Sequence, residues 1–509
     1  MDLDLSRRQF LGGSAAWIGL AAAGICENQL PVETVSIFFT TDLHGHITPV
    51  SGYGGHADLG GIARCATYIR EAKQKCRHSL LVDIGDVYQG TAESFSSEGR
   101  LMIGLFNLLG YDAWALGNHD FDWGREVLES NLALSKSPIV TGNIQISGQA
   151  SGSVGGSWKN VVPWTMKEVA GIKIALVGLT TPGLPYWVAP ETLGGVGVVD
   201  PALSLRQSVI EAKLAGANAI VLLGHMGHRS NDDFANPLNE LFKSVQGVDV
   251  LLAGHTHQNQ ASWQIGPVLC SQASYHGIHC GKLDLTFDRE SKKLIGRTVS
   301  TTLMDRNFAL DPAVMEKSEP ALKQASEQLA RKVATVIAPV EGKGRGSKLA
   351  KLFCEIFAEA LGRNGTPVDG IFHGTFGTAA LLPGELTVRN CWEMIPFENL
   401  LTIAEVSAQE LIEIVREDSG ERSSDRTLWP FDLRLDFEGR AERFSFKGME
   451  VASDRRFKIG FNSYDAQSGG QRLMKLRDIL ANPAAKRVVT GIDTRGALID
   501  GLLNRGNIS

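Results

Sequence analysis

Five short apolar runs in this chain each stop abruptly on side chains that bind metal ions. Uninterrupted apolar runs of this length are typical of strands buried on both faces of a sheet. In open α/β sheets, ligands bind just beyond the carboxyl ends of such strands. The pattern therefore predicts one polar crevice where the five ends meet. The residues at these ends are Asp42, His44 and His46; Asp86; Asn118, His119, Asp120 and Asp122; His225 and His228; and His255 and His257.

The side-chain types at these ends favour a pair of divalent ions. Two such ions, about 3.5–4 Å apart, can clamp the attacking and leaving oxygens of a phosphoryl displacement. Carboxylates and imidazoles without thiolates suit Zn, Mn or Fe rather than a structural zinc site. Any one of the histidines, taken alone, is better explained as an ordinary core or loop residue. Their recurrence at five strand ends is what favours a metal centre.

The order D-x-H, GD, GNHD, GH and GHTH resembles that of the calcineurin-like metallophosphoesterases. The segments GNHDFDWG, PIVTGNI, GIKIALVGLTTP and GHTH resemble the branch that contains 5′-nucleotidases, UDP-sugar hydrolases and 2′,3′-cyclic phosphodiesterases. The likeness is dense from Val35 to about Asp288 and looser to about residue 475. It implies an α/β fold: a four-layer domain of two sheets flanked by helices, followed by a second α/β domain.

The resemblance implies that seven of these side chains hold two divalent ions, Mn, Zn or Fe, whose identity the sequence leaves open. One carboxylate, Asp86, would bridge the two ions. The other ligands of the first ion would be Asp42, His44 and His257, and those of the second Asn118, His225 and His255.

The same resemblance implies a catalytic dyad of His119 and Asp122. The histidine would stabilise or protonate the phosphate oxygens, and the aspartate would orient its ring. A carboxylate on one ring nitrogen fixes the tautomer and raises the basicity of an imidazole. Asp120 is expected to shape the loop rather than bind metal, and His46 and His228 are expected outside the ligand set.

The C-terminal part resembles the substrate-recognition domain of the same branch, most closely in GELTVRNCWEMIPFENLLTIAEVSAQEL. The family has a glycine-rich loop, NGGGIR, whose arginine contacts the substrate. The corresponding stretch here, FHGTFGTAALLPG, keeps Gly374 and Gly377 but has no arginine. The loss of this arginine, with all metal ligands kept, predicts preserved hydrolysis with an altered substrate.

A second family segment carries an aromatic residue that stacks on the nucleobase, followed by GGDG. In FNSYDAQSGGQR this residue would be Tyr464, with Gln471 at the position of the family's aspartate. The alternative for Tyr464 is a core aromatic. Trp429 and Phe431 are the candidates for the other stacking residue.

The N-terminus resembles a twin-arginine export signal. SRRQFL, residues 6–11, precedes a weakly apolar stretch rich in glycine and alanine. This pattern predicts a signal peptide over residues 1–26, recognition by the twin-arginine export machinery, and a periplasmic or otherwise exported protein. The apolar stretch is too short for a stable membrane span. Lipid anchoring at Cys26 is disfavoured, because Ile25 is a poor residue for that cleavage site.

The rest of the chain divides into three expected parts. A metallophosphoesterase domain is expected over residues 34–305, a linking helix over 311–335, and a 5′-nucleotidase-type C-terminal substrate domain over 340–509. The cysteines are expected mainly as buried packing residues. Cys270 and Cys280 would approach one another only if the segment between them forms a hairpin.

Together these observations predict an exported dinuclear phosphoesterase that hydrolyses a phosphomonoester or related small anionic substrate, such as a nucleotide, by means of metal-bound hydroxide. One alternative is a thiosulfohydrolase of sulfur oxidation, a neighbouring branch that shares the dinuclear site. The other is a non-catalytic protein that binds metal or a ligand. The full ligand set and the His119–Asp122 pair favour an enzyme. A net charge of −6 argues against a nucleic-acid binder.

Overall fold

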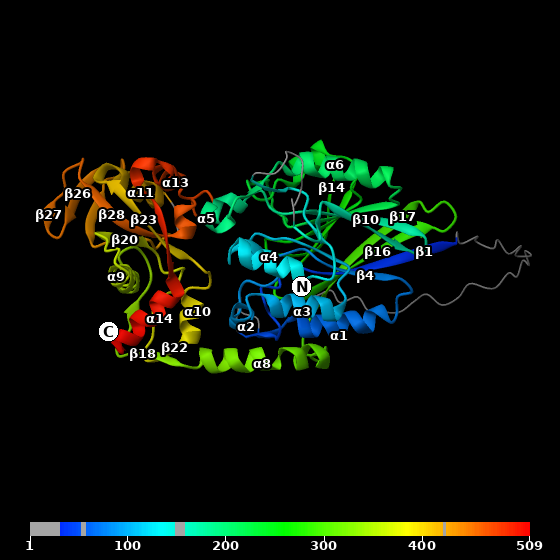
Figure 1. The fold of residues 1–509 in the computed structure, drawn as a ribbon, viewed down its shortest axis with the longest axis horizontal. Coiled ribbons are helices and arrows are strands. Elements are labelled where there is room, and N and C mark those ends of the chain that lie inside the picture. The colour runs from blue at the N-terminus through cyan, green and yellow to red at the C-terminus, as the bar shows by residue number, and fades with distance from the viewer. Residues whose placement is uncertain (1–30, 52–56, 148–157, 421–423) are drawn as a thin grey trace, which may run out of the picture.

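The computed structural model describes residues 31–51, 57–147, 158–420 and 424–509 of the chain. Figure 1 shows two bodies side by side, joined along one edge by helix α8 (Pro312–Leu329). The expected signal peptide, with its arginine pair and Cys26, lies outside the described residues.

The larger body contains two sheets whose central strands are parallel. The seven-stranded sheet has the spatial order β17 (Leu294–Leu303), β16 (His279–Asp288), β1 (Val32–Thr40), β4 (Ser79–Asp83), β5 (Ala113–Ala115), β6 (Ile139–Val140) and β8 (Val161–Val162). The six-stranded sheet has the order β14 (Asn259–Ile265), β15 (Val268–Ala273), β13 (Val250–Ala253), β12 (Ala219–Gly224), β10 (Ile172–Leu179) and β9 (Trp164–Val169). The five apolar runs are β1, β4, β5, β12 and β13, so each forms a buried strand, as predicted.

The two sheets pack face to face, and helices cover both outer faces. Alternate residues of the strands, such as Ile37 and Val82 in one sheet and Leu176 and Val221 in the other, form the core between the sheets. Helices α1 (Ile62–Lys73), α3 (Arg100–Leu109) and α4 (Arg125–Leu134) cover the seven-stranded sheet. Helices α6 (Pro201–Leu214) and α7 (Leu238–Ser244) cover the other. The four-layer expectation is therefore confirmed.

Short elements fill the loops of this body. They are β2 (Val50–Ser51), β3 (Ala57–Leu59), α2 (Ala92–Ser96), η2 (His119–Phe121), β7 (Ile144–Ile146), η3 (Leu184–Tyr186), α5 (Pro190–Leu193) and β11 (Val196–Val198).

Helix α8 carries the chain from one body to the other. The side chain of Asp311 accepts hydrogen bonds from Ala313 N and Val314 N and so caps the helix start, where a proline occupies the first turn. The helix ends at Leu329, before the end of the expected linking helix. The residues that follow form β18 (Lys332–Val336), which pairs with β22 (Gly384–Thr387) and β30 (Asn507–Ile508).

The smaller body is built on a mixed five-stranded sheet with helices on both faces, as expected for a second α/β domain. Its order is β24 (Thr427–Trp429), β20 (Gly370–His373), β28 (Arg456–Asn462), β23 (Leu400–Ser407) and β29 (Val488–Asp493). Helices α9 (Lys348–Arg363) and α14 (Thr494–Arg505) cover one face. Helices α11 (Ala408–Ser419) and α13 (Met474–Ala481) cover the other. The remaining elements are β19 (Val340–Glu341), β21 (Ala380–Leu381), α10 (Val388–Met394), β25 (Phe431–Leu435), β26 (Ala441–Phe446), β27 (Met449–Glu450), α12 (Ser463–Ala466) and η4 (Pro483–Ala485).

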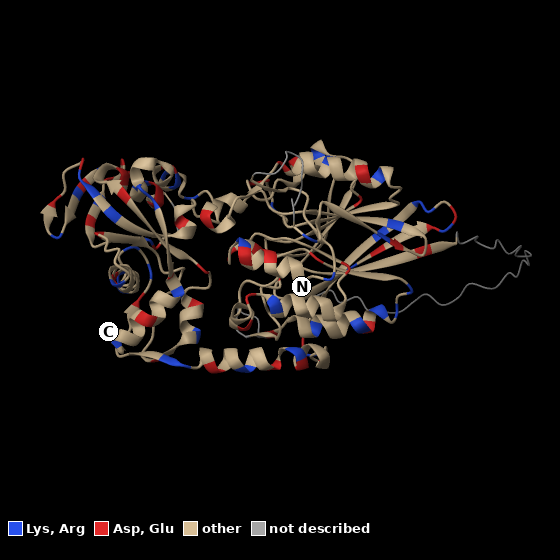
Figure 2. Cartoon of the chain, viewed as in Figure 1, with Lys and Arg blue, Asp and Glu red and all other residues tan. Residues whose placement is uncertain are grey.

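Acidic and basic residues are interspersed over the elements of both bodies, with no stripe of one sign in this view (Figure 2). Among the described residues, no helix has the length and apolar character needed to cross a membrane. The six described cysteines are free thiols, and all except Cys76 are buried. Cys270 lies on β15 and Cys280 on β16, in different sheets, so the hairpin between them is not formed.

Candidate active site

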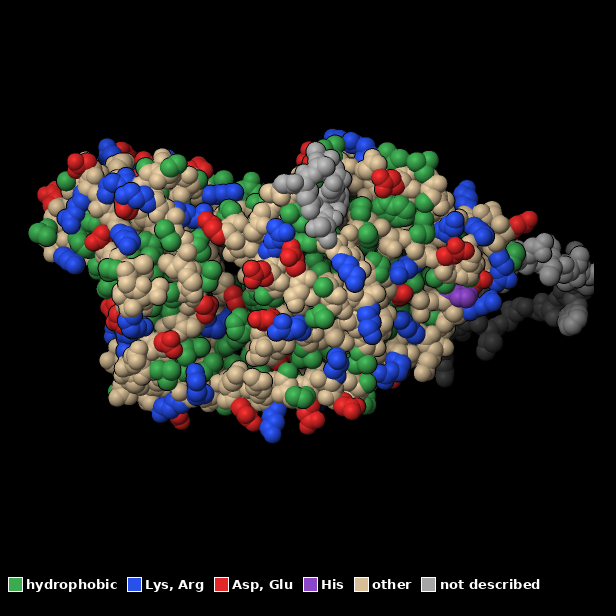
Figure 3. Space-filling model, viewed as in Figure 1, with side chains coloured by type: hydrophobic (Ala, Val, Ile, Leu, Met, Phe, Trp, Pro, Cys, Tyr) green, Lys and Arg blue, Asp and Glu red, His purple; other side chains and the backbone are tan. Residues whose placement is uncertain are grey.

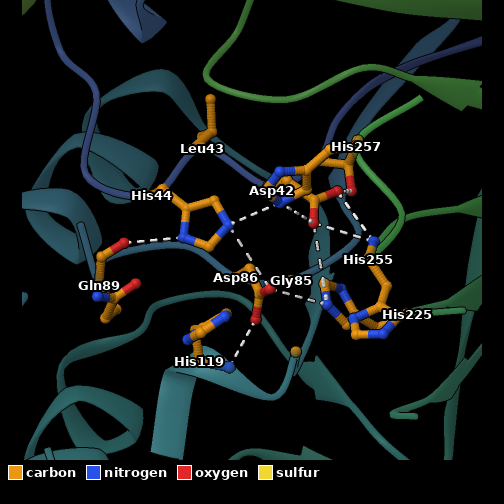
Figure 4. A network of polar contacts seen from close by, with 12 residues as sticks. Asp42, Leu43, His44, Gly85, Asp86, Gln89, His119, His225, His255 and His257 are labelled. Carbon is orange, nitrogen blue, oxygen red and sulfur yellow. Dashed lines mark hydrogen bonds and ion pairs between the residues drawn. The ribbon is translucent and has the colours of Figure 1, made fainter. Parts of the chain in front are cut away.

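The loops after the buried strands meet at one edge of the two packed sheets (Figure 4). Backbone hydrogen bonds join the loop after β1 to the loop after β4, from Asp42 N to Gly85 O and from His44 N to Asp86 O, both at 2.9 Å. The predicted ligands come from both sheets: Asp42 and His44 after β1, Asp86 after β4, Asn118 after β5, His225 after β12, and His255 and His257 after β13. The single crevice predicted from the strand ends is therefore present.

Five of these residues have a left-handed backbone. The φ angle is 50° at Asp42, 48° at His44, 56° at Asp86, 72° at His255 and 55° at His257. Residues other than glycine seldom adopt this conformation, and where it recurs it often marks a functional site. At each strand end it turns the chain sharply, which keeps several ligands close to the edge of the sheet.

The side chains form two groups that share one carboxylate. The potential ligand atoms of Asp42, His44, Asp86 and His257 all lie within 4.8 Å of one another. Those of Asp86, His225 and His255 do the same. Asp86 belongs to both groups, which is the position expected of a bridge.

The polar atoms of this centre fit a divalent cation. His44 Nε2 lies 3.1 Å from His257 Nε2. The other ring nitrogens of His44 and His225 lie 2.9 Å from the carbonyl oxygens of Gln89 and Ile84. A carbonyl oxygen only accepts, so each Nδ1 carries a proton, and in the neutral form of each ring Nε2 can offer its lone pair to the centre. Asn118 Oδ1 is also buried, and no described residue donates a hydrogen bond to it.

The electrostatics of the centre also suit a metal site. Burial, together with neighbouring histidines, lowers the pKa of His44 and of His255 to about 3, so both rings are neutral, as metal ligands must be. Burial opposes a charge on His225 as well, but Asp86 and Asp42 raise its pKa to about 9. A cation beside these carboxylates would therefore compete with a proton on His225, and its binding should weaken as the pH falls.

Asp120 shapes the loop, as expected. One oxygen of its carboxylate accepts from Gly117 N at 2.8 Å and Asp86 N at 3.0 Å, and the other accepts from Val87 N at 2.9 Å. Gly117 lies so close to Asp86 that a Cβ there would be 2.1 Å from Asp86 Oδ1. The glycine of GNHD is therefore required by the close approach of the two loops.

His119 and Asp122 form a hydrogen-bonded pair beside the two groups. His119 Nδ1 lies 2.6 Å from Asp122 Oδ2, and His119 N donates to Asp86 Oδ1 at 2.7 Å. Burial disfavours a charged ring, but the carboxylates of Asp122 and Asp86 raise the pKa of His119 to about 10. These carboxylates favour a protonated ring, in which Nε2–H is the donor that Asp122 does not engage.

His46 and His228 belong to neither group. The ring of His46 stacks on His276, with centroids 3.6 Å apart, and its Nδ1 lies 3.1 Å from Leu43 O. His228 contacts the edge of Trp263. Their exclusion from the expected ligand set agrees with this placement.

A cavity of about 1570 Å³ lies between the two bodies and reaches this centre. On one side it is lined by Asn118, His119, Asp122 and His255, and on the other by Phe376, Phe397, Tyr464 and Arg472. Figure 3 shows a gap between the bodies on the face in view, with hydrophobic and acidic side chains beside it. A ligand in the cavity would therefore touch both the dyad and the second domain.

A smaller cavity of about 170 Å³ adjoins the expected substrate residues. Gly374, Gly377 and Tyr464 line it together with Phe376. Asp425 fills the glycine-rich loop from within, because its Oδ2 accepts hydrogen bonds from Thr375 N at 3.0 Å and Gly377 N at 3.2 Å. These loop amides are already satisfied by a carboxylate of the protein itself.

The candidates for the second stacking aromatic were wrong. Phe431 packs against the core aromatics Phe444, Phe446 and Phe457, and Trp429 packs against the core beside α9. Neither lines the two cavities. Phe376, at φ 51° in the glycine-rich loop, lines both cavities together with Tyr464. The sequence did contain a signal for Phe376: it is an aromatic residue between Gly374 and Gly377, in the loop that lacks the family's arginine.

Sequence reasoning also missed two residues on the wall of the large cavity. Phe397 stacks on the ring of His119, and Arg472 donates to the hydroxyl of Tyr464 at 2.8 Å. Both lie in segments already singled out, IPFEN and GGQR. The motif itself gave no sign that they face the cavity.

Residues 35–259 match the calcineurin-like phosphoesterase family. The chain is 25% identical over 545 residues to a probable 5′-nucleotidase of Treponema pallidum (strain Nichols), covering 89% of this chain and 90% of that protein. Its fold is similar to that of a 5′-nucleotidase precursor from Thermus thermophilus, with a TM-score of 0.70, 23% identity, and 94% and 97% of the two chains covered. It is also similar to the sulfate thiohydrolase SoxB of Thermus thermophilus, with a TM-score of 0.64, 17% identity, and 93% and 94% covered. At these identities the two structures show a shared fold.

Proposed function

We propose that this chain, a metal-dependent hydrolase of phosphoric esters similar to the 5′-nucleotidases among the calcineurin-like metallophosphoesterases, uses two divalent ions to cleave phosphomonoesters of nucleotide-like compounds. The observation that carries the proposal is the large cavity. One wall offers the candidate metal ligands and the dyad, and the opposite wall offers aromatic side chains.

The residues on the first wall suit phosphoryl transfer. The first ion would be held by Asp42, His44, Asp86 and His257, and the second by Asp86, Asn118, His225 and His255. Such a pair of Mn, Zn or Fe ions polarises phosphoryl oxygens and activates water near neutral pH. The bridging position of Asp86 also brings its carboxylate to the backbone amide of His119, so that the dyad and the metal centre share one anchor.

The dyad would act on the phosphate through the imidazolium of His119. Asp122 Oδ2 lies 2.6 Å from Nδ1 of His119, and this contact fixes the ring. The Nε2–H group of His119 then remains available to donate to the substrate. A positive donor at this place stabilises the charge that develops on the phosphate oxygens and can protonate the leaving oxygen.

The second wall suits a flat organic leaving group. Tyr464 and Phe376 line adjoining cavities, and Arg472 lies over the Tyr464 ring, 5.8 Å from its centroid. Stacking of a base on an aromatic ring contributes roughly 1–3 kcal/mol. The glycine-rich loop lacks the family's arginine, and its amides at Thr375 and Gly377 already donate to Asp425. This loop therefore offers few donors to an anionic group of the substrate.

The test compares AMP with p-nitrophenyl phosphate on purified protein supplied with Mn²⁺. We expect hydrolysis of both, abolished by EDTA, with a preference in kcat/KM for AMP below about a thousandfold, because remote binding energy is what normally raises that ratio. Replacing Tyr464 by leucine should lower kcat/KM for AMP about 5- to 100-fold. A preference for AMP of a thousandfold or more, unaffected by Tyr464→Leu, would show that other residues recognise the nucleotide.

We also propose that the protein works outside the cytoplasm. The support is the SRRQFL segment and the apolar stretch after it. Fractionation of cells that express the whole chain tests this proposal.

A further inference from the structure

Residues 395–399, between α10 and β23, form a loop that reaches from the second domain onto the catalytic dyad. The ring of Phe397 stacks on the ring of His119, with centroids 5.6 Å apart and an angle of 10° between the planes. The ring of His44 also lies near the ring of His119, with centroids 5.2 Å apart and an angle of 67° between the planes. Asp122 contacts the ring of His119 at Nδ1, and Phe397 lies parallel to one face of the ring.

The loop is fixed by Glu398. Its Oε2 accepts from Gln89 Nε2 at 2.7 Å, across the boundary between the two bodies. Its Oε1 accepts from Arg495 Nη1 at 2.7 Å, and Arg495 Nε donates to Ile395 O at 2.8 Å. Arg495 also lies over the ring of Trp392, 3.6 Å from its centroid. The side chains of Glu398 and Arg495 are only 10% and 4% exposed, so this pair is shielded from solvent.

Gln89 connects this loop to the metal side of the site. Its side chain binds Glu398, while its backbone carbonyl oxygen lies 2.9 Å from His44 Nδ1 (Figure 4). One residue of the first domain therefore holds both a candidate metal ligand and the loop of the second domain. Any displacement of the loop would act on this residue.

Core packing does not explain Phe397. Its side chain is 42% exposed and lines the large cavity, whereas the buried aromatics of the second domain lie in its two cores. Phe397 therefore lies at the wall of the cavity, in a loop held by the buried Glu398–Arg495 pair, and its place there is not explained by the packing of either core.

We propose that the second domain completes the catalytic centre through this loop, with Phe397 as a positioning residue that fixes the plane of the His119 ring and Glu398 as the residue that holds the loop. The inference rests on the proposed phosphomonoesterase activity. It goes beyond that activity because the second domain then serves the reaction of every substrate, including those too small to reach Tyr464.

The experiment uses the full chain and three variants. Phe397→Leu removes the aromatic ring that stacks on His119, and Phe397→Tyr keeps an aromatic ring at this position. Glu398→Gln weakens the contacts of the loop with Gln89 and Arg495. The matched control is Phe437→Leu, an aromatic change in the same domain at a side chain that is 95% exposed and lines neither cavity. The readouts are kcat and KM for AMP and p-nitrophenyl phosphate, bound metal, and the NMR spectrum of protein labelled at histidine Cε1.

In Phe397→Leu we expect kcat for both esters to fall by about ten- to a hundredfold, since a small misplacement of a reacting group has effects of this size. KM for p-nitrophenyl phosphate and the metal content should stay within about twofold of the unmodified protein's values. Phe397→Tyr should recover most of kcat, Glu398→Gln should lower kcat for both esters, and Phe437→Leu should behave as the unmodified protein. The His119 resonance, assigned from the His119→Gln variant, should move downfield in Phe397→Leu as the ring current of the phenyl group is lost.

Two results would overturn the inference. If Phe397→Leu raises KM for AMP alone and leaves p-nitrophenyl phosphate unchanged, Phe397 is only a contact of the leaving group. If the His119 resonance does not move, the stack is absent in solution. Failure of the unmodified protein to hydrolyse either ester would instead refute the proposed function, and the NMR comparison would still decide whether Phe397 lies on His119.

Discussion

Replacing Asp86 by asparagine should remove both metal ions, whereas replacing His44 or His255 should remove one ion each. Asp86 is the one residue common to the two candidate ligand groups. Asparagine is the substitute because these positions have φ angles of 56°, 48° and 72°, which asparagine tolerates better than alanine does. The three variants therefore differ in ligand chemistry more than in backbone strain.

The size of the effect follows from the charges in the centre. Two divalent ions at the usual separation of about 3.5–4 Å repel one another by roughly 17 kcal/mol at an effective dielectric constant near 20. Among the candidate ligands only Asp42 and Asp86 are anionic, and only Asp86 belongs to both groups. Without it, the second group keeps two imidazoles and the Asn118 amide, with no negative charge. We therefore expect a fall from about two ions per chain to fewer than about 0.5.

The assay is metal analysis by mass spectrometry after dialysis against one fixed free concentration of Mn²⁺, with thermal unfolding to show that each variant is folded. His44→Asn and His255→Asn should each retain about one ion, because each side chain serves a single site. If Asp86→Asn still holds about two ions, Asp86 is not a shared ligand. If His44→Asn and His255→Asn each lose both ions, the two groups are not separate sites.

Three further outcomes are expected. His119→Ala should keep its metals and lose about 10²–10⁴-fold in kcat, with a smaller loss in Asp122→Asn, since these groups act on the phosphate and not on the ions. Kinetics and metal analysis of the same samples check this prediction. Near-normal turnover in His119→Ala would remove the residue from the mechanism. Burial lowers the pKa of His373, so below pH 6.5 the unfolded chain binds a proton that the folded chain does not. The free energy of unfolding, measured in urea from pH 7.5 to 5, should therefore fall more steeply in the unmodified protein than in His373→Asn, by up to about 1.4 kcal/mol per pH unit. Equal slopes in the two proteins would contradict this expectation. Replacing Arg7 and Arg8 by lysine should hold the protein in the cytoplasm, as cell fractionation would show, and an unchanged exported yield would point to another route.

Much of the candidate metal centre was predictable because its residues sit at the ends of buried strands. The strands β1, β4 and β12 each contain a short apolar run, at residues 37–39, 80–82 and 219–223, and in parallel packing their carboxyl ends meet at one edge. A ligand such as Asp86 is therefore placed by a local signal, the step from an apolar run to a glycine and a carboxylate. The resemblance to a known family then supplied the grouping of ligands and the dyad.

The second domain was less predictable because its contacts join distant parts of the chain. The end of the linking helix was placed too late, since β18 is specified by pairing with β22 and with β30 at the far end of the chain. Trp429 and Phe431 are aromatic residues near the right motif, but the pattern of a short strand does not tell which face meets a core and which meets a cavity. The sequence does not by itself place Phe376 at the cavity, because its position there depends on the left-handed turn of its loop.

The sequence by itself determined the buried strands, the crevice and the side chains at its edge, because strand burial and the residues that follow each strand are local properties of the chain. The two-sheet domain was implied by the resemblance to a known family. Only the tertiary structure decided that Phe397 lies on His119 and that Glu398 binds Gln89, a residue 309 positions earlier in the chain. The physical reason is that these contacts arise where two separately folded cores meet. The pattern of apolar and polar residues around Phe397 or around Gln89 does not indicate which surface of the other domain each residue contacts.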